Sequence, residues 1–515
     1  MLFRSALKIL SLILALITLG LPLFGKDKEI TILHTNDFHS AFDPIPAYWL
    51  EGSPKLGGAA YLSALINELR EEEDTVFLFD SGDMFTGMLA NLTEGEALME
   101  MMMTMEYDAL GIGNHEFDYG IEPFKRGIHR VSFPVLGANI FYKGTDQLFS
   151  RAYTILERDG IRLGVIGIIG LDARSVILPS YVEDLDFRDP IPYVRKGVEE
   201  LKPLVDVIVV LTHQGKTGPM QTDAEHRPEV QRDFDEDIKL AGAVEGIDVI
   251  VSGHAHRGIE VPYIHPKTGT LIVQTYGYGT RLGYLKLFFD GEKVTGHEGR
   301  LLKVWSDKLK PDPLVEKKIS YYKKKVDHII GEVVGYSDLR LVRDYVAESS
   351  LGNFATDVIK EITNSEIAFT NAGGLRADLP EGSITKGNVL DAFPFHNTVV
   401  FTSLNGAQIT AILEQGLSME RGMIQVSGIR AIYDLKKPIN NRVLNVEING
   451  KPLDKKKMYK VGTHSFLAQG GDLYNTFLEG EYEDRKINLS EEIINYLKAN
   501  KEIKEPKRGR LIPAK

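Results

Sequence analysis

Five short apolar runs of this sequence each end in a histidine, an aspartate or an asparagine, and no other feature constrains the fold as strongly. Segments with helical periodicity separate the runs; in residues 57–73, for example, apolar residues recur every three or four positions. β-Branched runs that alternate with helices predict the buried strands of an α/β fold. Because side chains beyond the carboxyl ends of such strands gather in one crevice, we expect the five polar endings to form one site. The endings read "ILHTNDFH", "FLFDSGD", "LGIGNHEFD", "VLTHQG" and "VSGHAH".

The length and the charge of the chain limit its organisation and its partners. A chain of 515 residues is too long for one hydrophobic core, so two or more domains are expected. The formal net charge of −12 argues against a nucleic acid polymer as a partner, because binding to such a polymer relies on Lys and Arg side chains that release counterions. A small phosphate ester is compatible with this charge, since metal ions or local arginines override the global sign.

The first residues have the pattern of a secretory signal. Arg4 and Lys8 precede an apolar stretch over 9–19, and a proline and a glycine follow it. We therefore predict a signal peptide over residues 1–25 and a periplasmic or secreted protein. The alternative is a retained anchor that contacts the membrane, because the apolar stretch over 9–24 is nearly long enough to span it. The chain contains no cysteine, which excludes disulfides and cysteine lipidation and suits an oxidising compartment.

The composition of the sequence changes near residue 300. The segment "KPDPLVEKKISYYKKKVDHII" begins with two prolines and continues as a charged amphipathic helix, which we expect to connect two domains. The predicted units are a first domain over 26–305, a linker helix over 306–330 and a second domain over 331–515. The residues expected on the apolar side of the helix are Leu314, Val315, Ile319, Tyr322, Val326 and Ile329.

The polar endings of the five runs offer a set of metal ligands without sulfur. A carboxylate such as Asp83 can bridge two cations, and the pair His254 and His256 can reach two cations from one turn. Nitrogen and oxygen donors suit Zn, Mn, Fe or Co better than Ca or Cu(I). Each motif alone is weak, and five unrelated polar loops are the alternative, but five motifs at strand ends in this order favour a metal centre. The candidate ligands are Asp37, His39, Asp83, Asn114, His213, His254 and His256.

Three motifs in the second half of the chain are typical of a nucleotide site. "NAGGLRADLP" places Asn371 and Arg376 around a glycine turn, where the guanidinium offers a fork for phosphate oxygens. "FPFHN" and "SFLAQGGD" supply Phe395 and Phe466, whose rings can stack on the two faces of a flat base. Asp472 follows six residues after Phe466. The alternatives are a tight turn with a solvated arginine and ordinary core packing of the two rings.

Together, the motifs "DFH", "GDMFTG", "GNHEFD", "THQG" and "GHAH" resemble those of the metallophosphoesterase superfamily. With the motifs of the second half added, nearly the whole chain after the signal resembles the secreted 5′-nucleotidase family, which includes UDP-sugar hydrolases. The resemblance implies a four-layer α/β/β/α domain that a helix joins to a second, α+β domain that binds substrate. It implies two divalent ions, one held by Asp37, His39, Asp83 and His256 and the other by Asp83, Asn114, His213 and His254.

The resemblance also implies roles for further residues. His115 and Asp118 match the catalytic dyad of the family: an imidazolium at His115 would stabilise charge in the transition state, and Asp118 would orient the ring and favour its charged form. Glu116, between them, is expected to be structural. The substrate residues implied are Asn371 near the nucleoside, Arg376 on the phosphate, Phe395 and Phe466 on the base, and Asp472 on the ribose hydroxyls.

One departure from the family concerns the arginines that read phosphate. Members of the family carry one or two such residues shortly before the "LGN" segment, but this chain offers only Arg340 and Arg343, and the sequence does not assign either of them to a family position. How a second phosphate would be held, and therefore which nucleotide is preferred, stays open at this point.

We expect a secreted hydrolase with two metal ions that releases phosphate from nucleoside 5′-monophosphates and also acts on UDP-sugars or other nucleotides. Because the ions and the base clamp lie in different domains, closure of the domains is expected to be required for turnover. The alternatives are a 2′,3′-cyclic-nucleotide 2′-phosphodiesterase/3′-nucleotidase, a thiosulfohydrolase, against which the base-site motifs speak, and a non-catalytic surface protein that binds nucleotides. No oligomeric state is predicted.

Overall fold

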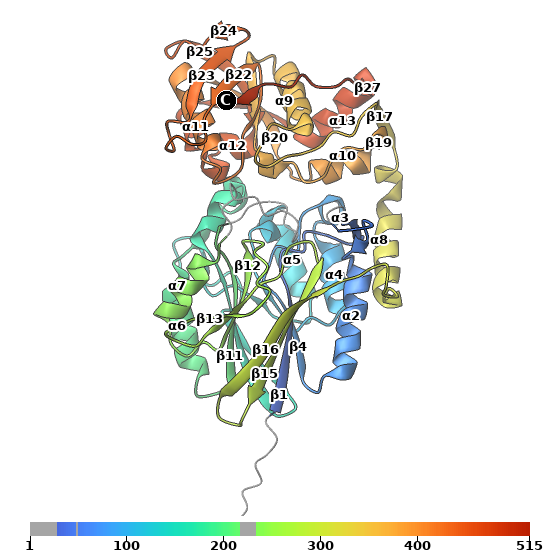
Figure 1. Ribbon diagram of the computed structural model, residues 1–515, viewed down its shortest axis with the longest axis vertical. Coiled ribbons are helices and arrows are strands. Elements are labelled where there is room, and N and C mark those ends of the chain that lie inside the picture. Colours follow the sequence, from blue (N-terminus) through green and yellow to red (C-terminus); the bar gives the residue numbers. More distant parts are fainter. Residues whose placement is uncertain (1–27, 48–49, 217–232, 515) are drawn as a thin grey trace, which may run out of the picture.

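The computed structural model describes residues 28–47, 50–216 and 233–514, which form two lobes joined along one side by a helix (Figure 1). The predicted signal peptide over 1–25 lies outside the described residues and stays a prediction. Within the described ranges, no helix combines the length and the apolar character needed to cross a bilayer.

The first lobe contains two six-stranded sheets, each built around parallel strands. In the first sheet, β1 pairs with parallel β4 on one side and with antiparallel β15 on the other, in the order β16-β15-β1-β4-β5-β6. Its strands are β1 (Lys28–Thr35), β4 (Val76–Asp80), β5 (Ala109–Gly111), β6 (Val135–Leu136), β15 (Arg281–Phe289) and β16 (Val294–Lys303). The second sheet has the order β13-β14-β12-β11-β9-β8. Its strands are β8 (Tyr153–Arg158), β9 (Ile161–Ile169), β11 (Val207–Gln214), β12 (Val249–His254), β13 (Tyr263–Ile264) and β14 (Leu271–Val273).

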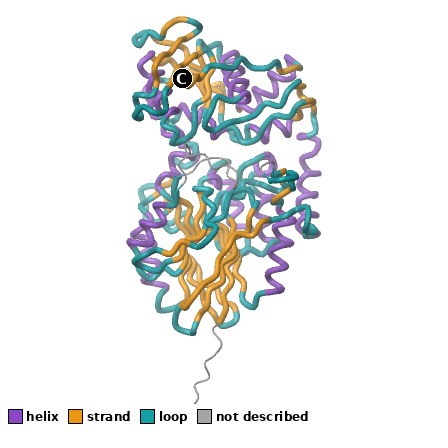
Figure 2. The backbone as a smooth tube through the Cα atoms, in the orientation of Figure 1, coloured by secondary structure: helices purple, strands orange, loops and turns teal. Residues whose placement is uncertain are grey.

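The two sheets pack face to face, because their strands carry apolar side chains on the faces that meet. Ile32, Phe79, Val165 and Val209 lie in this core and are fully buried. Helices cover the outer face of each sheet (Figure 2), so the predicted four-layer α/β/β/α arrangement is confirmed. The helices on the first sheet are α2 (Ala59–Glu72), α4 (Glu96–Thr104) and α5 (Ile121–Arg130), and those on the second are α6 (Pro190–Leu201) and α7 (Asp235–Ala243). Smaller elements of this lobe are β2 (Ile45–Pro46), β3 (Lys55–Leu56), α3 (Met88–Thr93), β7 (Ile140–Tyr142) and β10 (Leu185–Phe187).

The second lobe is an α+β unit with two hydrophobic cores, as expected. Its largest sheet has the order β21-β18-β25-β20-β26, and smaller sheets have the orders β19-β17-β27 and β24-β23-β22-β28. The strands of the largest sheet are β18 (Ile367–Thr370), β20 (Thr398–Asn405), β21 (Gln425–Ser427), β25 (Met458–His464) and β26 (Tyr482–Asn488). The remaining strands are β17 (Val333–Ser337), β19 (Gly382–Thr385), β22 (Ile429–Tyr433), β23 (Val443–Ile448), β24 (Lys451–Pro452), β27 (Glu502–Ile503) and β28 (Leu511–Pro513). The helices are α9 (Ser350–Ile362), α10 (Lys386–Ala392), α11 (Gly406–Leu417), α12 (Ser465–Ala468) and α13 (Leu489–Asn500).

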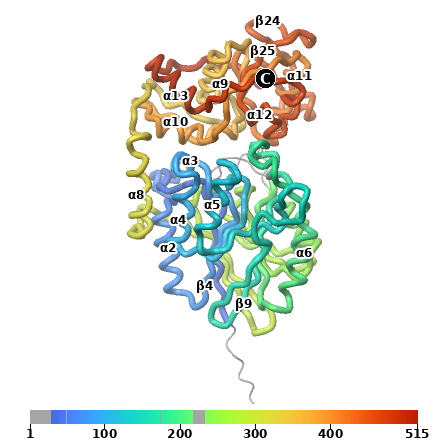
Figure 3. The backbone as a smooth tube through the Cα atoms, turned by 180° about the vertical axis from the view of Figure 1, so that it is seen from behind, coloured from blue at the N-terminus to red at the C-terminus, as the bar shows by residue number. Residues whose placement is uncertain are grey.

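Helix α8 (Pro313–Ile330) connects the lobes and runs along the edge of the molecule in both views (Figures 1 and 3). Asp312 caps its first turn: the Oδ1 atom accepts hydrogen bonds from the backbone N–H groups of Leu314 (2.8 Å) and Val315 (3.3 Å). The Oδ2 atom accepts from Ser63 Oγ (2.7 Å) and Asn67 Nδ2 (2.9 Å) on α2. One carboxylate therefore both starts the helix and fastens it to the first lobe.

The apolar side of α8 is narrower than the sequence predicted. Val315, Ile319, Tyr322 and Val326 are buried, at the spacing of a single helical stripe. Leu314 was expected on this side, and that expectation is wrong: its side chain is 67% exposed. It precedes the stripe by one residue, and a rotation of about 100° per residue carries it out of the interface.

Replacement of Asp312 by alanine is expected to destabilise the protein, because four donors lose their acceptor. The loss of an N-cap alone costs about 1–2 kcal/mol, so thermal unfolding followed by circular dichroism should shift to lower temperature. Lys317→Ala, at an exposed position of the same helix, serves as the control and should leave the unfolding midpoint nearly unchanged. Equal midpoints for the two variants would contradict this account of the cap.

Candidate metal centre

The five polar endings of the apolar runs meet at the edge of the first lobe that faces the second lobe. Asp37 and His39 lie in the loop after β1, and Asp83 and Asn114 follow β4 and β5 of the same sheet. The second sheet contributes His213 near the end of β11, and His254 and His256 at and just after the end of β12. All seven candidate ligands are at least nine-tenths buried.

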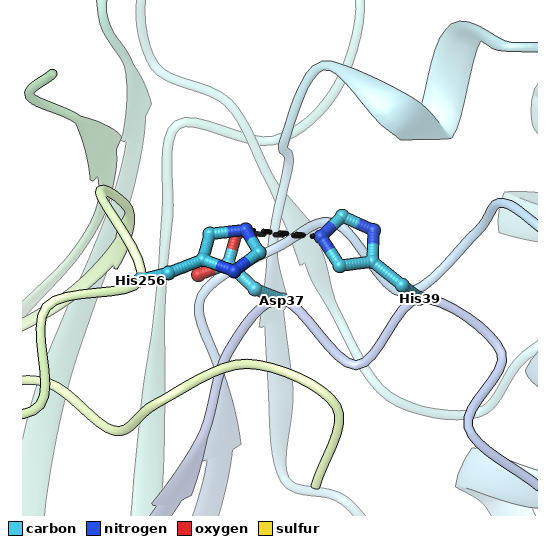
Figure 4. A group of neighbouring side chains, drawn as sticks. All are labelled: Asp37, His39 and His256. Carbon is cyan, nitrogen blue, oxygen red and sulfur yellow. Dashed lines mark hydrogen bonds and ion pairs between the residues drawn. The ribbon is translucent and has the colours of Figure 1, made fainter. Parts of the chain in front are cut away.

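Asp37, His39 and His256 form a first cluster (Figure 4). The Nε2 atoms of His39 and His256 face each other at 3.1 Å, and His256 Nε2 lies 3.2 Å from Asp37 Oδ1. Three donor atoms therefore converge from two loops that lie far apart in the sequence.

Asp83, His213 and His254 form a second cluster. The Nδ1–H of His213 donates to the carbonyl oxygen of Ser81 (2.7 Å), which leaves Nε2 directed at two further oxygen atoms. These are Asp83 Oδ2 at 3.1 Å and Asn114 Oδ1 at 3.2 Å. Asp83 also groups with His39 and His115, so its carboxylate lies between the two clusters.

The donor atoms of both clusters fit divalent cations. In the part of the chain that the structure describes, His254 Nε2 is buried without a hydrogen-bond partner. Burial disfavours a charged imidazole at His213, but the Asp83 carboxylate outweighs it and raises the pKa of His213 to about 10. Positive charge therefore stabilises the clusters, and one cation can bind the lone pairs of several of their nitrogen and oxygen atoms at once. Residues of these types suit two ions that share Asp83.

The backbone at the clusters is strained. Asp37, His39, Asp83, His254 and His256 all have positive φ values, between 47° and 70°, where a residue other than glycine costs about 1–2 kcal/mol. Such strain persists only where the surroundings enforce it, and it gathers at functional sites.

Glycine makes room for the bridging carboxylate. At Gly113, a Cβ atom would lie 2.4 Å from Asp83 Oδ1 and 2.8 Å from the ring of His213. Gly113 of "GIGNHEFDYG" therefore lets the polar loop after β5 approach Asp83 of the first sheet and His213 of the second.

Glu116 holds two of these loops together. Its carboxylate accepts hydrogen bonds from the backbone N–H groups of Asp83 (2.9 Å), Met84 (2.9 Å) and Gly113 (2.7 Å), and the side chain is 1% exposed. The expectation that Glu116 is structural agrees with these contacts. Its carboxylate fixes the loop on which Asp83 lies.

His115 and Asp118 are in direct contact. The Nδ1 atom of His115 lies 2.9 Å and 3.0 Å from the two carboxylate oxygens of Asp118, which also accepts a hydrogen bond from Thr86 Oγ1 (2.8 Å). Burial lowers the pKa of His115, but the charges of Asp118 and then Asp83 outweigh it, so the pKa is raised above its usual value. The two carboxylates thus favour the protonated ring, whose Nε2 lies 3.9 Å from Asp83 Oδ2.

The predicted substrate residues of the second lobe line the same pocket as five of the seven metal candidates and the pair His115 and Asp118. Asn371 Nδ2 donates to Asp472 Oδ2 (2.6 Å), and both side chains are buried. Phe395 stacks on the His115 ring, with centroids 5.8 Å apart, and Phe466 stacks on buried His464. The pocket therefore combines both lobes. Its lining includes Asn371, Arg376, Phe395, Phe466 and Asp472.

Several pocket residues were missed in the sequence. Tyr345 and Arg421 line the pocket, but neither lies at the end of an apolar run or in a recognisable motif. Arg340 and Arg343, the two arginines considered for phosphate, instead pair with Asp378 (2.9 and 3.8 Å) and are not part of the pocket lining.

Replacement of Glu116 by glutamine should weaken metal binding. One amide oxygen cannot accept all the N–H groups that the carboxylate accepts, and the new NH₂ group would face donors. Loss of an outer contact of this kind costs about 10–100-fold in metal affinity. Metal content after gel filtration measures the effect, with Glu122→Gln, an exposed position nearby, as the control. Full metal retention by the Glu116 variant would argue against the positioning role.

Comparisons with known proteins show which protein families the chain resembles. It matches the family model described as "Calcineurin-like phosphoesterase" over residues 30–258 and the one described as "5'-nucleotidase, C-terminal domain" over residues 328–479. It is 30% identical to the trifunctional nucleotide phosphoesterase protein YfkN of Bacillus subtilis, over 88% of this chain but only 33% of that protein, so it spans one third of the length of that relative. It is 28% identical to the 5′-nucleotidase of Bos taurus, over 91% of this chain and 89% of that one.

Among solved structures, the 5′-nucleotidase precursor from Thermus thermophilus is similar over 94% of this chain and 99% of that chain, with a TM-score of 0.82 and 29% identity. The two matching family models follow each other in this chain as its two lobes do, and the His/Asp clusters lie in the first of them. The chain therefore belongs to the 5′-nucleotidase family of metal-dependent phosphoester hydrolases.

Proposed function

We propose that the chain releases phosphate from nucleoside 5′-monophosphates at the pocket between its lobes. One observation supports this most directly: the His/Asp clusters, the dyad and a set of nucleoside-type contacts line a single pocket. The phosphate would lie at the clusters, and the nucleoside would extend toward the second lobe. UDP-sugars and other nucleotides are proposed as further substrates.

The proposed cofactors are two divalent ions, of Zn, Mn, Fe or Co, in keeping with a nitrogen and oxygen donor set. Asp37, His39, Asp83 and His256 would hold one ion; Asp83, Asn114, His213 and His254 would hold the other. Bound there, the ions would supply Lewis acidity toward the phosphate and a nucleophilic water at neutral pH.

The residues of the chain itself would bind the phosphate and stabilise charge. His115, kept cationic by Asp118, would stabilise negative charge on the phosphoryl oxygens in the transition state. Arg376 would bind the phosphate from the second lobe; its charge reaches His39 and His115, where it adds to burial in lowering the pKa of His39. Fixed cationic donors of this kind need no reorganisation during the reaction.

The nucleoside would be held by the second lobe. Phe395, in the loop between α10 and β20, and Phe466, in α12, line the pocket, and a base stacked between such rings gains about 1–3 kcal/mol per base. Asp472 would accept hydrogen bonds from the ribose hydroxyls, and Asn371, bonded to Asp472, would orient it. We also propose that the chain is exported, on the pattern of its first 25 residues.

A substrate panel tests the proposed function. Purified mature protein with added divalent metal should release phosphate from AMP faster than from 3′-AMP or 2′,3′-cyclic AMP, and UDP-glucose shows whether diphosphates are cleaved. A preference for the cyclic nucleotide would instead support the 2′,3′-cyclic-nucleotide phosphodiesterase. No phosphate release from any member of the panel would support the non-catalytic binding protein.

His115→Ala is expected to keep both metal ions but to lose about 10²–10³-fold in phosphate release, the usual cost of removing one preorganised donor that stabilises transition-state charge. Metal analysis beside steady-state kinetics measures the two effects separately. His129→Ala, exposed on α5, is the control and should match the unchanged enzyme. A metal-replete His115 variant with full activity would refute the role.

Movement of the lobes is proposed to be part of turnover, with α8 in the hinge region. The backbone N–H of Ser180 donates to Gln469 Oε1 across the lobes (3.1 Å). Because the chain has no cysteine, cysteines placed at these two positions can be joined selectively by a short bis-methanethiosulfonate reagent, which forms a disulfide with each thiol and releases methanesulfinate. The cross-linked enzyme should lose multiple turnover, because product cannot leave, and cleavage of the cross-link should restore it. Unchanged turnover in the cross-linked form would exclude the proposal.

A further inference from the structure

Arg421 connects the two lobes at the wall of the pocket. It lies in the loop between α11 and β21, lines the pocket and is 4% exposed. Its Nη2 atom donates to Asp172 Oδ2 and to Ser175 Oγ (3.1 Å). Both partners belong to the 3₁₀ turn η2 (Leu171–Val176) of the first lobe. A buried guanidinium of the second lobe is therefore fixed at one end by the first lobe.

The loop that carries Arg421 is held in one conformation. Gly422 has a φ of 76°, and a Cβ atom there would lie 2.4 Å from Cε2 of Tyr345, so the loop packs directly on that ring. The backbone N–H of Met423 donates to the carbonyl oxygen of Tyr345 (2.7 Å). The guanidinium is thus preorganised before any substrate enters, which limits the entropy lost on binding.

Two polar atoms in this part of the pocket lack partners. Within the described residues, Arg421 Nε and Asn371 Oδ1 are both buried and make no hydrogen bond. Asp472 interacts with both side chains: it accepts from Asn371 Nδ2 (2.6 Å), and the Arg421 charge opposes the burial that raises the pKa of Asp472 to about 6. A buried donor and a buried acceptor without partners are rare in folded proteins. A hydroxyl group accepts and donates at once, so it can serve as a partner for either kind of atom.

The contacts of Arg421 place it next to the residues expected to bind the nucleoside. Both arginines line the pocket, and the charges of both reach Asp472, which accepts a hydrogen bond from Asn371 Nδ2 (2.6 Å). Arg421 is also fixed by its hydrogen bonds to Asp172 and Ser175 of the first lobe. Its guanidinium therefore lies in the part of the pocket where Asp472 and Asn371 meet.

We propose that Arg421 is a specificity-determining residue that donates its Nε–H to a ribose hydroxyl of the bound nucleotide. This inference rests on the proposed function and deepens it: the site would distinguish ribonucleotides from deoxyribonucleotides. The ion pair with Asp172 leaves Nε as the donor for substrate, and Asn371 accepts from a hydroxyl of the same sugar. A nucleotide without that hydroxyl leaves a buried charged donor unpaired, which lowers kcat/KM by about 10–100-fold.

The test compares AMP with 2′-deoxy-AMP and 3′-deoxy-AMP in the unchanged enzyme and in Arg421→Lys and Arg421→Met. The unchanged enzyme should prefer AMP over at least one deoxy substrate by about 10–100-fold in kcat/KM. Both variants should lose this preference, because lysine keeps the charge near Asp172 but has no Nε–H. Asp172→Asn removes the ion pair and keeps Nε, so it should lower all rates in proportion and preserve the preference.

The ratio of rates separates recognition of the ribose from a purely structural bridge between lobes, which would lower every rate alike. Equal rates of the unchanged enzyme on all three substrates, or an unchanged preference in both Arg421 variants, would overturn the inference. Inhibition of p-nitrophenyl phosphate hydrolysis by adenosine and by its deoxy analogues tests it without nucleotide turnover. If AMP is not hydrolysed but adenosine inhibits better than a deoxyadenosine, and only with Arg421 present, the proposed function fails and the inference stands. No difference between these inhibitors would overturn it.

Discussion

The meeting of Asp83 and His213 between two sheets is the contact on which the whole site depends. Asp83 follows β4 of the first sheet, His213 lies near the end of β11 of the second, and their side chains lie 3.1 Å apart in a buried place. Burial works against ionisation of Asp83, but His213 and His115 outweigh it and hold the pKa of this carboxyl well below its usual value. A buried carboxylate of this kind needs nearby positive charge. The packing of the two sheets thus buries a carboxylate whose negative charge must be balanced, either by protonated histidines or by bound cations.

The second requirement is that two lobes share one pocket. The first lobe supplies the clusters and the dyad, and the second supplies the side chains suited to a nucleoside. The stack of Phe395 on His115 shows how close the two sets are, because a ring assigned to the base packs on the histidine of the dyad itself. The residues proposed for reaction and those proposed for recognition are therefore in direct contact across the interface.

Whether a residue of the site can be predicted from the sequence depends on whether a local sequence pattern marks its position. The seven candidate ligands could be found because each lies at the end of an apolar run, and strand ends converge by the geometry of α/β sheets. The four layers follow from the same alternation of strands and helices. Arg421 and Tyr345 could not be found, because their position depends on how one lobe docks on the other, which no local period encodes. The prediction that Leu314 is buried was wrong for a smaller reason: near the start of a helix, a shift of one residue decides whether a side chain faces the core or the solvent.

Five of the candidate ligands share a left-handed backbone, and this has a consequence for the life of the protein. At about 1–2 kcal/mol each, the strain in these loops sums to a value near the whole stability of a typical domain, roughly 5–15 kcal/mol. Loops under this much strain are expected to leave their folded conformation more readily when no cation is bound between the ligands. Cation supply would then govern how long the molecule survives among proteases, besides how fast it works.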